Sequence, residues 1–291
     1  MATPAPLSVP LMEAYKPSPA LASCITDIWV WEIPSALTHS DGGALTLLPD
    51  GHPTMCFVYG DPLTATDAQR TFTTRSAVCG FQARPVHVSC DGHAAGITVR
   101  FRPWSLARFF APSLEEAAER RIDCRDLFPR SEVEDLESQL FEQPTSVARV
   151  RLVERFLLGV LRARESDRLV ERTVMHLCSG SHGMSVAQIA REFGATERTL
   201  ERRFRCAIGV PPKRFARVMR LQAAVSVQAP PERWSEFALD FGYYDQSHMN
   251  REARAIFGAS PSSMLKPPAS QIAQGFQHLA RETALPVKLF R

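Results

Sequence analysis

The pattern of apolar and polar positions changes near residue 103. Before it, short runs of β-forming residues are separated by turns rich in Gly, Pro and Asp, and after it, apolar residues recur at helical spacing. Ile97, Val99 and Phe101 alternate with polar residues and share one face of a strand. The strand-like runs are 25–33, 44–48, 54–59 and 97–102. This half of the chain predicts a β-sandwich or small barrel.

Helical periodicity dominates the second half. Short helices are expected over 105–111 and from Ser113. Longer helices are expected over 131–140, 147–164, 167–178 and 270–283, and Ser131 is the expected cap of the first of these. The 147–164 stretch is strongly amphipathic. Its apolar side fits a packing helix of the first domain and, equally well, a dimerisation helix or a connector between domains. The Gly/Ser-rich stretch 179–183 is the best linker candidate.

Between 185 and 265 one pattern occurs twice, 48 to 49 residues apart. Residues 186–194 read Val-Ala-Gln-Ile-Ala-Arg-Glu-Phe-Gly, and 234–242 read Trp-Ser-Glu-Phe-Ala-Leu-Asp-Phe-Gly. A Gly-x-x-Pro step follows each copy, at 209–212 and 258–261. Since a short helix, a glycine turn and a second helix form a helix-turn-helix, the repeat predicts two DNA-reading helices on one chain.

The first copy has a complete set of helix signals. Ser185 and Gln188 form a capping box, Gly194 breaks the first helix, and Thr196 caps the second. Two residues of the second helix are expected in the core, Leu200 and Phe204. Four share its outer face, where side chains could reach base edges: Arg198, Glu201, Arg202 and Arg205. The alternative is a solvated charged face on which Glu201 pairs with Arg198 or Arg205.

The second copy is predicted to pack less well. Its second helix is capped by Asp245, Met249 and Ala253 take the positions of Leu200 and Phe204, and Arg233 is a poor cap for its first helix. Its outward residues are Gln246, Ser247, Asn250 and Arg251, whose polar types suit DNA contacts. A continuous helix over 215–227, with core residues Phe215, Val218, Met219 and Val225, would hold the two reading helices apart. Helices in successive major grooves lie about 34 Å apart.

These residues resemble the AraC/XylS family of bacterial transcription regulators over 185–265. The most specific part is Phe241-Gly-Tyr-x-Asp-Gln-Ser-His248, together with the Arg-Arg-Phe run at 202–204. The resemblance implies base contacts by Arg198, Glu201, Arg202, Gln246, Ser247, Asn250 and Arg251. We expect phosphate contacts from Thr196, Arg205, Lys213, His248 and Arg254.

A weaker resemblance covers the N-terminal part. Tyr15-x-Pro17, the turn 48–51 and the run 96–103 are similar to the sensor domains of one AraC-like subgroup. The implied fold class is α+β, with a cupin-like or related β-rich domain before an all-α domain of two helix-turn-helix units. We predict a sensor or dimerisation domain with trailing helices over 1–165, a DNA-binding domain over 166–268 and a tail over 269–291.

Charge and apolar content agree with this organisation. Residues 184–268 carry a net charge of +5 and the remainder −2, so the basic part coincides with the expected DNA-binding part. No apolar run reaches the roughly 18 residues of a membrane helix, and no signal sequence is recognised at the N-terminus, so we expect a cytoplasmic protein. The expected partner is double-stranded promoter DNA, and RNA polymerase and a second copy of the chain are further candidates.

Two alternative functions are also compatible with the sequence. In the first, the β-rich domain is a cupin-like metal- or ligand-dependent enzyme with His52, His87 and His93 as metal ligands. A related hypothesis is a structural metal bound by His87-x-x-Cys90-x-x-His93 together with Cys79 or His52. However, GxSxG, HExxH, P-loop and GxGxxG motifs are all missing. We therefore expect no enzyme and no cofactor, apart from an unidentified small-molecule effector. The second alternative is a partner-binding protein with a vestigial DNA module.

Overall fold

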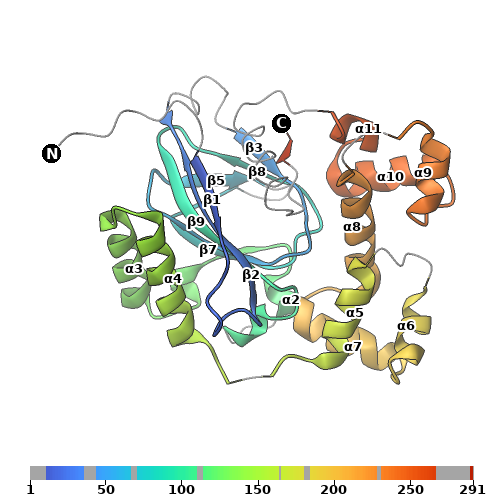
Figure 1. Ribbon diagram of the computed structural model, residues 1–291, viewed down its shortest axis with the longest axis horizontal. Coiled ribbons are helices and arrows are strands. Elements are labelled where there is room, and N and C mark those ends of the chain that lie inside the picture. Colours follow the sequence, from blue (N-terminus) through green and yellow to red (C-terminus); the bar gives the residue numbers. More distant parts are fainter. Residues whose placement is uncertain are drawn as a thin grey trace.

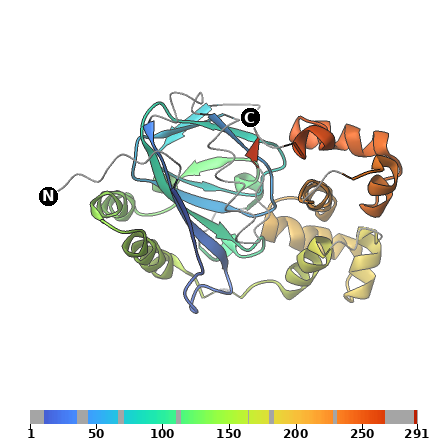
Figure 2. The same cartoon turned by 45° about the horizontal axis from the view of Figure 1, so that its top comes forward.

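The computed structural model describes residues 11–35, 44–66, 71–109, 114–163, 165–179, 184–227, 231–266 and 289–290. A β-rich body formed by the first part of the chain lies at its centre. Helices α3 and α4 cover one side of this body, and the helices from α5 onward lie on the opposite side (Figures 1 and 2). The predicted order of a β-rich domain followed by a helical domain is confirmed.

Two antiparallel sheets form the body. The first has the strand order β1-β2-β9-β4-β7-β10: β1 (Leu11–Tyr15), β2 (Ile25–Ile33), β9 (Ala94–Phe101), β4 (Thr54–Val58), β7 (Ser76–Cys79) and β10 (Arg121–Asp123). The second has the order β11-β3-β8-β5-β6: β11 (Leu289–Phe290), β3 (Ala44–Leu47), β8 (Val86–Ser89), β5 (Leu63–Thr66) and β6 (Thr71–Thr74). The four strand-like runs of the sequence are all strands.

The central strand β9 is buried on both faces. Ile97, Val99 and Phe101 are fully buried and belong to the core that includes α3 and α4. The opposite face carries Thr98 and Arg100, and Arg100 is only 3% exposed because this face looks toward the second sheet. The polar half of the alternation therefore lines an interior, not the outer surface.

The helices of the first part are η1 (Leu106–Arg108), α2 (Leu114–Ala117), η2 (Cys124–Asp126), α3 (Arg130–Glu142) and α4 (Ser146–Val160). Three predictions need correction. In the described part of the stretch 105–111 the helix is only the 3₁₀ turn η1. Ser131 lies inside α3 because that helix begins after Pro129, and α4 ends at Val160 because Leu161 has extended backbone angles. The start expected at Ser113 lies outside the described residues.

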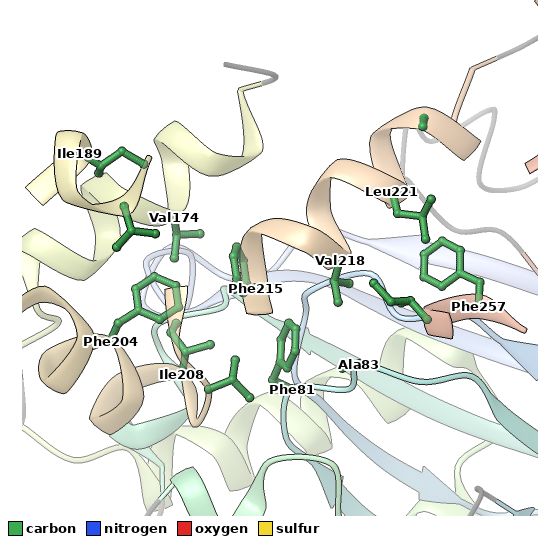
Figure 3. Packing of buried hydrophobic residues seen from close by; sticks show 14 of the residues in the cluster. Phe81, Ala83, Val174, Ile189, Phe204, Ile208, Phe215, Val218, Leu221 and Phe257 are labelled. Atoms are coloured by element: carbon green, nitrogen blue, oxygen red, sulfur yellow. The ribbon is translucent and has the colours of Figure 1, made fainter. Parts of the chain in front are cut away.

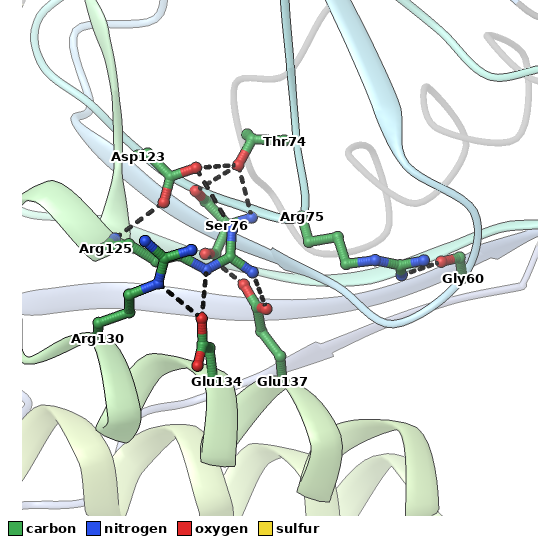
Figure 4. Close-up of polar contacts among 9 residues, drawn as sticks. All are labelled: Gly60, Thr74, Arg75, Ser76, Asp123, Arg125, Arg130, Glu134 and Glu137. Atoms are coloured by element: carbon green, nitrogen blue, oxygen red, sulfur yellow. Dashed lines mark hydrogen bonds and ion pairs between the residues drawn. The ribbon is translucent and has the colours of Figure 1, made fainter.

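Polar contacts fasten α3 to the edge of the first sheet. Glu137 accepts hydrogen bonds from Ser76 Oγ at 2.6 Å and from Arg125 Nη2 at 2.5 Å, and Arg125 also lies near Glu134 (Figure 4). Thr74, at the end of β6 in the second sheet, donates to Oδ2 of Asp123 on β10 of the first sheet at 2.7 Å. α4 packs alongside through Phe156, Val150, Val153 and Leu157. This helix thus packs in the first domain, one of its predicted roles.

The second part consists of seven helices among the described residues: α5 (Arg168–Cys178), α6 (Val186–Glu192), α7 (Glu197–Ile208), α8 (Pro212–Val225), α9 (Trp234–Asp240), α10 (Gln246–Phe257) and α11 (Pro261–Met264). The connector α8 begins at Pro212, earlier than the predicted residue 215, because proline is favoured in the first turn. The tail helix expected over 270–283 lies outside the described residues. No helix of the described part could cross a membrane.

Candidate DNA-binding interface

The first helix-turn-helix unit consists of α6 and α7, and its local signals act as the sequence predicts. Ser185 and Gln188 form the capping box, with the Ser185 amide donating to Gln188 Oε1 at 2.7 Å. Gly194 has φ +72°, the left-handed conformation that favours glycine in a tight turn. The Thr196 hydroxyl then accepts from the Thr199 amide and begins α7. The predicted start, turn and second start are confirmed.

α7 separates its core side from its outer side clearly. Leu200 and Phe204 are fully buried, whereas Arg198, Arg202 and Arg205 are exposed and Glu201 is half-buried. Within the described residues, the ion pairs of this helix join Arg203 to Asp167 and Glu197 to Lys213, rather than Glu201 to a neighbouring arginine. The outer face is therefore available for an external partner.

A latch that sequence reasoning missed fixes α7 against α5. Arg203 donates from Nε to Asp167 Oδ2 at 2.5 Å and from Nη2 to Asp167 Oδ1 at 2.6 Å. The same carboxylate caps α5 by accepting from the Leu169 and Val170 amides. Burial raises the pKa of Asp167, but the bonds from Arg203 and the amides outweigh it and hold the pKa below its ordinary value. The two partners are 36 residues apart, so no local pattern indicates the pair.

The second unit consists of α9 and α10 and repeats the same geometry. Gly242 has φ +71° in the turn, and Asp245 caps α10 by accepting from the His248 amide at 2.6 Å. Arg233 at the start of α9 makes no side-chain cap, as predicted. Met249 and Ala253 are fully buried, so the core is closed although alanine stands where the first unit has Phe204.

The second reading face is also accessible. Gln246, Ser247 and Arg251 are exposed, and Asn250 is half-buried. Of the predicted phosphate contacts, Thr196, Lys213 and Arg254 are exposed as well. His248 is partly engaged within the chain, since its Nε2 lies 3.9 Å from Glu252 and its ring lies against Tyr243.

A buried carboxylate, also missed from the sequence, joins α10 to the connector helix. Glu252 is 8% exposed, and its Oε2 accepts from Arg217 Nε on α8 at 3.3 Å. Nearby, Arg220 of α8 lies over the Tyr243 ring and donates to the Gly242 carbonyl oxygen at 3.3 Å. Desolvation raises the pKa of Tyr243, and the Glu252 charge adds to this. The connector thus holds both the turn and the reading helix of the second unit.

The histidines proposed for a metal do not meet. His52 Nδ1 lies 2.9 Å from the Phe101 carbonyl oxygen, His87 Nδ1 lies 2.9 Å from Thr46 Oγ1, and His93 Nε2 lies 2.8 Å from Glu32 Oε1. Within the described ranges, no group of three or more His, Cys, Asp or Glu residues is arranged to hold a metal ion. These residues have separate structural partners.

A second candidate site lies between the two sheets. The cavity has a volume of about 230 Å³, and its lining is mostly apolar, including Trp29, Trp31 and Phe72. At one end Arg100 donates to Asp27 at 3.0 Å and to Asp50 at 2.9 Å. Burial lowers the pKa of the adjacent His52 to about 4, and nearby Arg100 adds to this, so His52 is neutral at pH 7.

Comparisons with known proteins agree with this interface. Residues 189–267 match a family described as a helix-turn-helix domain, and residues 13–123 match a domain of unknown function (DUF6597). Over 85 residues the chain is 31% identical to the putative HTH-type transcriptional regulator YkgA of Escherichia coli K12. That alignment covers 29% of this chain and 36% of YkgA, about a third of the relative's length.

Solved structures that align with the chain include ToxT from Vibrio cholerae. One ToxT structure aligns with TM-score 0.48 and 9% identity over 89% of this chain and 98% of ToxT. Another, described as bound to an unsaturated fatty acid, aligns with TM-score 0.45 and 9% identity over 90% and 97%.

The C-terminal part of the chain is thus a helix-turn-helix DNA-binding domain, which defines the class of protein. More particularly, this region matches an AraC-type helix-turn-helix domain and a segment of a bacterial transcriptional regulator, so the resemblance seen in the sequence is confirmed. The predicted DNA-binding domain is thus confirmed for this part of the chain, and the matches give the enzyme alternative no support.

Proposed function

We propose that the whole chain is a sequence-specific transcription regulator that reads promoter DNA with both helix-turn-helix units. The observation that carries this proposal is the pair of outward faces on α7 and α10, each presented by a closed core. The base-reading residues are Arg198, Glu201, Arg202, Gln246, Ser247, Asn250 and Arg251. Arginine suits bidentate contacts to guanine, and Asn or Gln suits adenine.

Phosphate contacts would supply much of the affinity. We assign them to Thr196, Arg205, Lys213, His248 and Arg254. Because cationic contacts release counterions from DNA, binding should weaken steeply with salt.

A binding titration with Arg202→Ala tests the reading role, with Lys213→Ala as the matched control. Loss of a bidentate base contact should cost about 1–3 kcal/mol on the operator and relax one position. Lys213→Ala should weaken operator and random DNA alike and reduce the salt slope. An equal loss on both DNAs for Arg202→Ala would refute the base-reading role.

The N-terminal domain is proposed to sense a small apolar effector in the cavity between its sheets. Support comes from the mostly apolar lining with the charged groups of Arg100 and Asp50 beside it, which is the composition of many ligand sites. The volume of about 230 Å³ limits the effector to a small molecule. A screen of apolar compounds for thermal stabilisation tests this, because a ligand that binds only the folded state raises the melting temperature. A cavity-blocking substitution should abolish the stabilisation.

We also propose a sensor or dimerisation domain over 1–165, a DNA-binding domain over 166–268 and a tail over 269–291, in a cytoplasmic protein. Two further partners are proposed, a second copy of the chain and RNA polymerase. A second copy of the chain would be detected by sedimentation at increasing concentration. Contact with RNA polymerase would appear as altered transcription from an operator-bearing template with purified components.

A further inference from the structure

The turn of the second helix-turn-helix unit contains one residue more than the turn of the first. Between the turn glycine and the cap of the following helix, the first unit has only Ala195, whereas the second has Tyr243 and Tyr244. The Ala195 amide donates to the carbonyl oxygen of Ala190, five residues earlier, at 2.8 Å. The Tyr243 amide makes the equivalent bond to Ala238 at 2.9 Å. Tyr243 therefore takes the place of Ala195, and Tyr244 is the additional residue.

The two tyrosines have opposite environments. Tyr243 is 2% exposed, and the guanidinium of Arg220 lies 5.3 Å from its ring centroid. Tyr244 is 86% exposed, more than any other large hydrophobic side chain of the part of the chain that the structure describes. Its backbone stands between the buried Tyr243 and the cap Asp245, whose carboxylate accepts from the His248 amide at 2.6 Å. The backbone is thus fixed on both sides while the ring lies in solvent.

A continuous core also fixes this turn relative to the first unit. One buried cluster includes Phe81 of the N-terminal domain, Phe215 and Leu221 of α8, and Phe257 of α10 (Figure 3). The ring centroids of Phe215 and of Phe204 on α7 are 5.5 Å apart. Because α7 and α10 pack on the same connector helix, the turn before α10 keeps a fixed position relative to the first reading helix.

The additional residue lies at the end of α10 that would meet DNA. In a helix-turn-helix, residues at the N-terminal end of the second helix contact base edges in the major groove. Tyr244 directly precedes the cap of this helix, and the first two helical residues, Gln246 and Ser247, are exposed as well. The ring of Tyr244 is therefore placed among the side chains of this unit that first reach a bound duplex.

The cap of α10 decides between the phosphate backbone and a base as the contact of this ring. The hydroxyl of Thr196 caps α7, but the carboxylate of Asp245 caps α10. A carboxylate next to the ring repels a phosphate group, so the backbone is the less favourable contact. Among the groups that base pairs present in the major groove, the thymine C5-methyl group is the apolar one. An aromatic ring gains stability by covering such apolar surface.

We propose that the ring of Tyr244 packs on the C5-methyl group of a thymine, so that the second unit prefers a T·A pair at one end of its DNA element. This inference rests on the proposed reading of DNA by both units and adds a residue to it. Gln246 and Ser247 read hydrogen-bonding groups, whereas the ring reads an apolar group. The shorter turn of the first unit lacks the additional residue, so the preference belongs to the second element alone.

Replacement of thymine by uracil tests the contact, because it removes the methyl group and leaves base pairing unchanged. The full-length protein is titrated with an operator obtained by selection from random DNA, in which the thymines are replaced by uracil one at a time. For the wild type, one replacement in the second element should weaken binding about fourfold, the loss for one buried group the size of a methylene. Tyr244→Phe should retain this sensitivity because the ring remains.

Removal of the ring should remove the sensitivity. Tyr244→Ser should bind the thymine operator about fourfold more weakly than wild type and should bind the uracil operator equally well, since both changes remove the same contact. Leu239→Ser, which also removes an exposed hydrophobic side chain of the second unit, is the matched control and should keep the sensitivity. Uracil in the first element should affect wild type and Tyr244→Ser alike. Circular dichroism and thermal unfolding establish that each variant is folded.

The outcomes separate this contact from the proposed function. A uracil sensitivity that persists in Tyr244→Ser, or a second element in which no uracil replacement weakens binding, overturns the contact and leaves the proposed function standing. An equal loss for Tyr244→Ser on operator and random DNA also overturns the contact, since the ring then touches the backbone. A wild type that binds operator and random DNA alike overturns the proposed function, and the contact with it.

Discussion

The two helix-turn-helix units share one geometry but are held in different ways. The first is anchored in the body of the protein by Phe81 and by the bond between Arg203 and Asp167. The second packs on the connector helix through apolar residues such as Phe257 and Leu221 and through the ion pair of Glu252 with Arg217, and it exposes Leu239 (60%) and Tyr244 (86%). The two units have the same fold but need not be equally stable. We expect the first unit to be the more rigid of the two.

The largest expected effect comes from making the first unit resemble the second. Phe204→Ala places at the first core position the residue that stands at the second, Ala253. Phe204 is fully buried and its ring lies against that of Phe215 on α8. The loss of its side chain should therefore cost about 3–5 kcal/mol of unfolding free energy. Chemical denaturation measures this, and a cost below that of an exposed-site control such as Leu239→Ala would contradict the anchored core.

A larger side chain at the second core position should destabilise the protein, for a different physical reason. Ala253→Leu adds carbon to a position with no exposed surface, so overpacking should cost about 1–3 kcal/mol. Hydrogen exchange should increase in α9 and α10 and stay unchanged in α6 and α7. A stabilised second unit would show that its core contains a void that the smaller side chain leaves open.

Removal of the Glu252 partner tests the polar attachment of the second unit. Arg217→Ala leaves a buried carboxylate without its ion pair, at a cost of about 1–2 kcal/mol, because Arg217 itself is half exposed. Arg217→Lys should recover part of this loss. DNA contacts of the second unit, mapped by footprinting, should weaken while those of the first unit persist.

The latch of the first unit should respond to acid. Because the folded-state pKa of Asp167 lies below the unfolded value of about 3.9, its stabilisation is present above about pH 4 and is lost as pH falls through the folded pKa. Asp167→Asn retains a capping side chain but removes the charge, so the variant should lose less stability than wild type over this acidic range. Identical acid profiles would exclude the latch.

The smallest effect concerns the missing cap of the second unit. Arg233→Ser places a capping residue three positions before Glu236, which forms the capping-box pattern of the first unit. The exposed pair of Arg233 with Glu236 that it replaces is worth little. We expect a gain of about 0.5–1 kcal/mol, read as slower exchange at the start of α9.

Short-range features of both units could be predicted from the sequence because each depends on residues a few positions apart. The Ser185 box, the turn at Gly194 and the cap at Asp245 are of this kind. The bond from Arg203 to Asp167 and the insertion of Phe81 join distant segments, and neither residue type nor spacing indicates such partners. The cavity was missed because Arg100 on β9 fits an outer polar face equally well until the second sheet is in place.

Sequence reading by both units can be examined by selection of bound sequences from random DNA with the full-length protein, with Arg202→Ala and Asn250→Ala in parallel. We expect a motif of two elements about one helical turn, roughly 10 base pairs, apart. Arg202→Ala should relax one element and Asn250→Ala the other. No enriched motif, or a single element that both substitutions relax, would contradict sequence reading by both units.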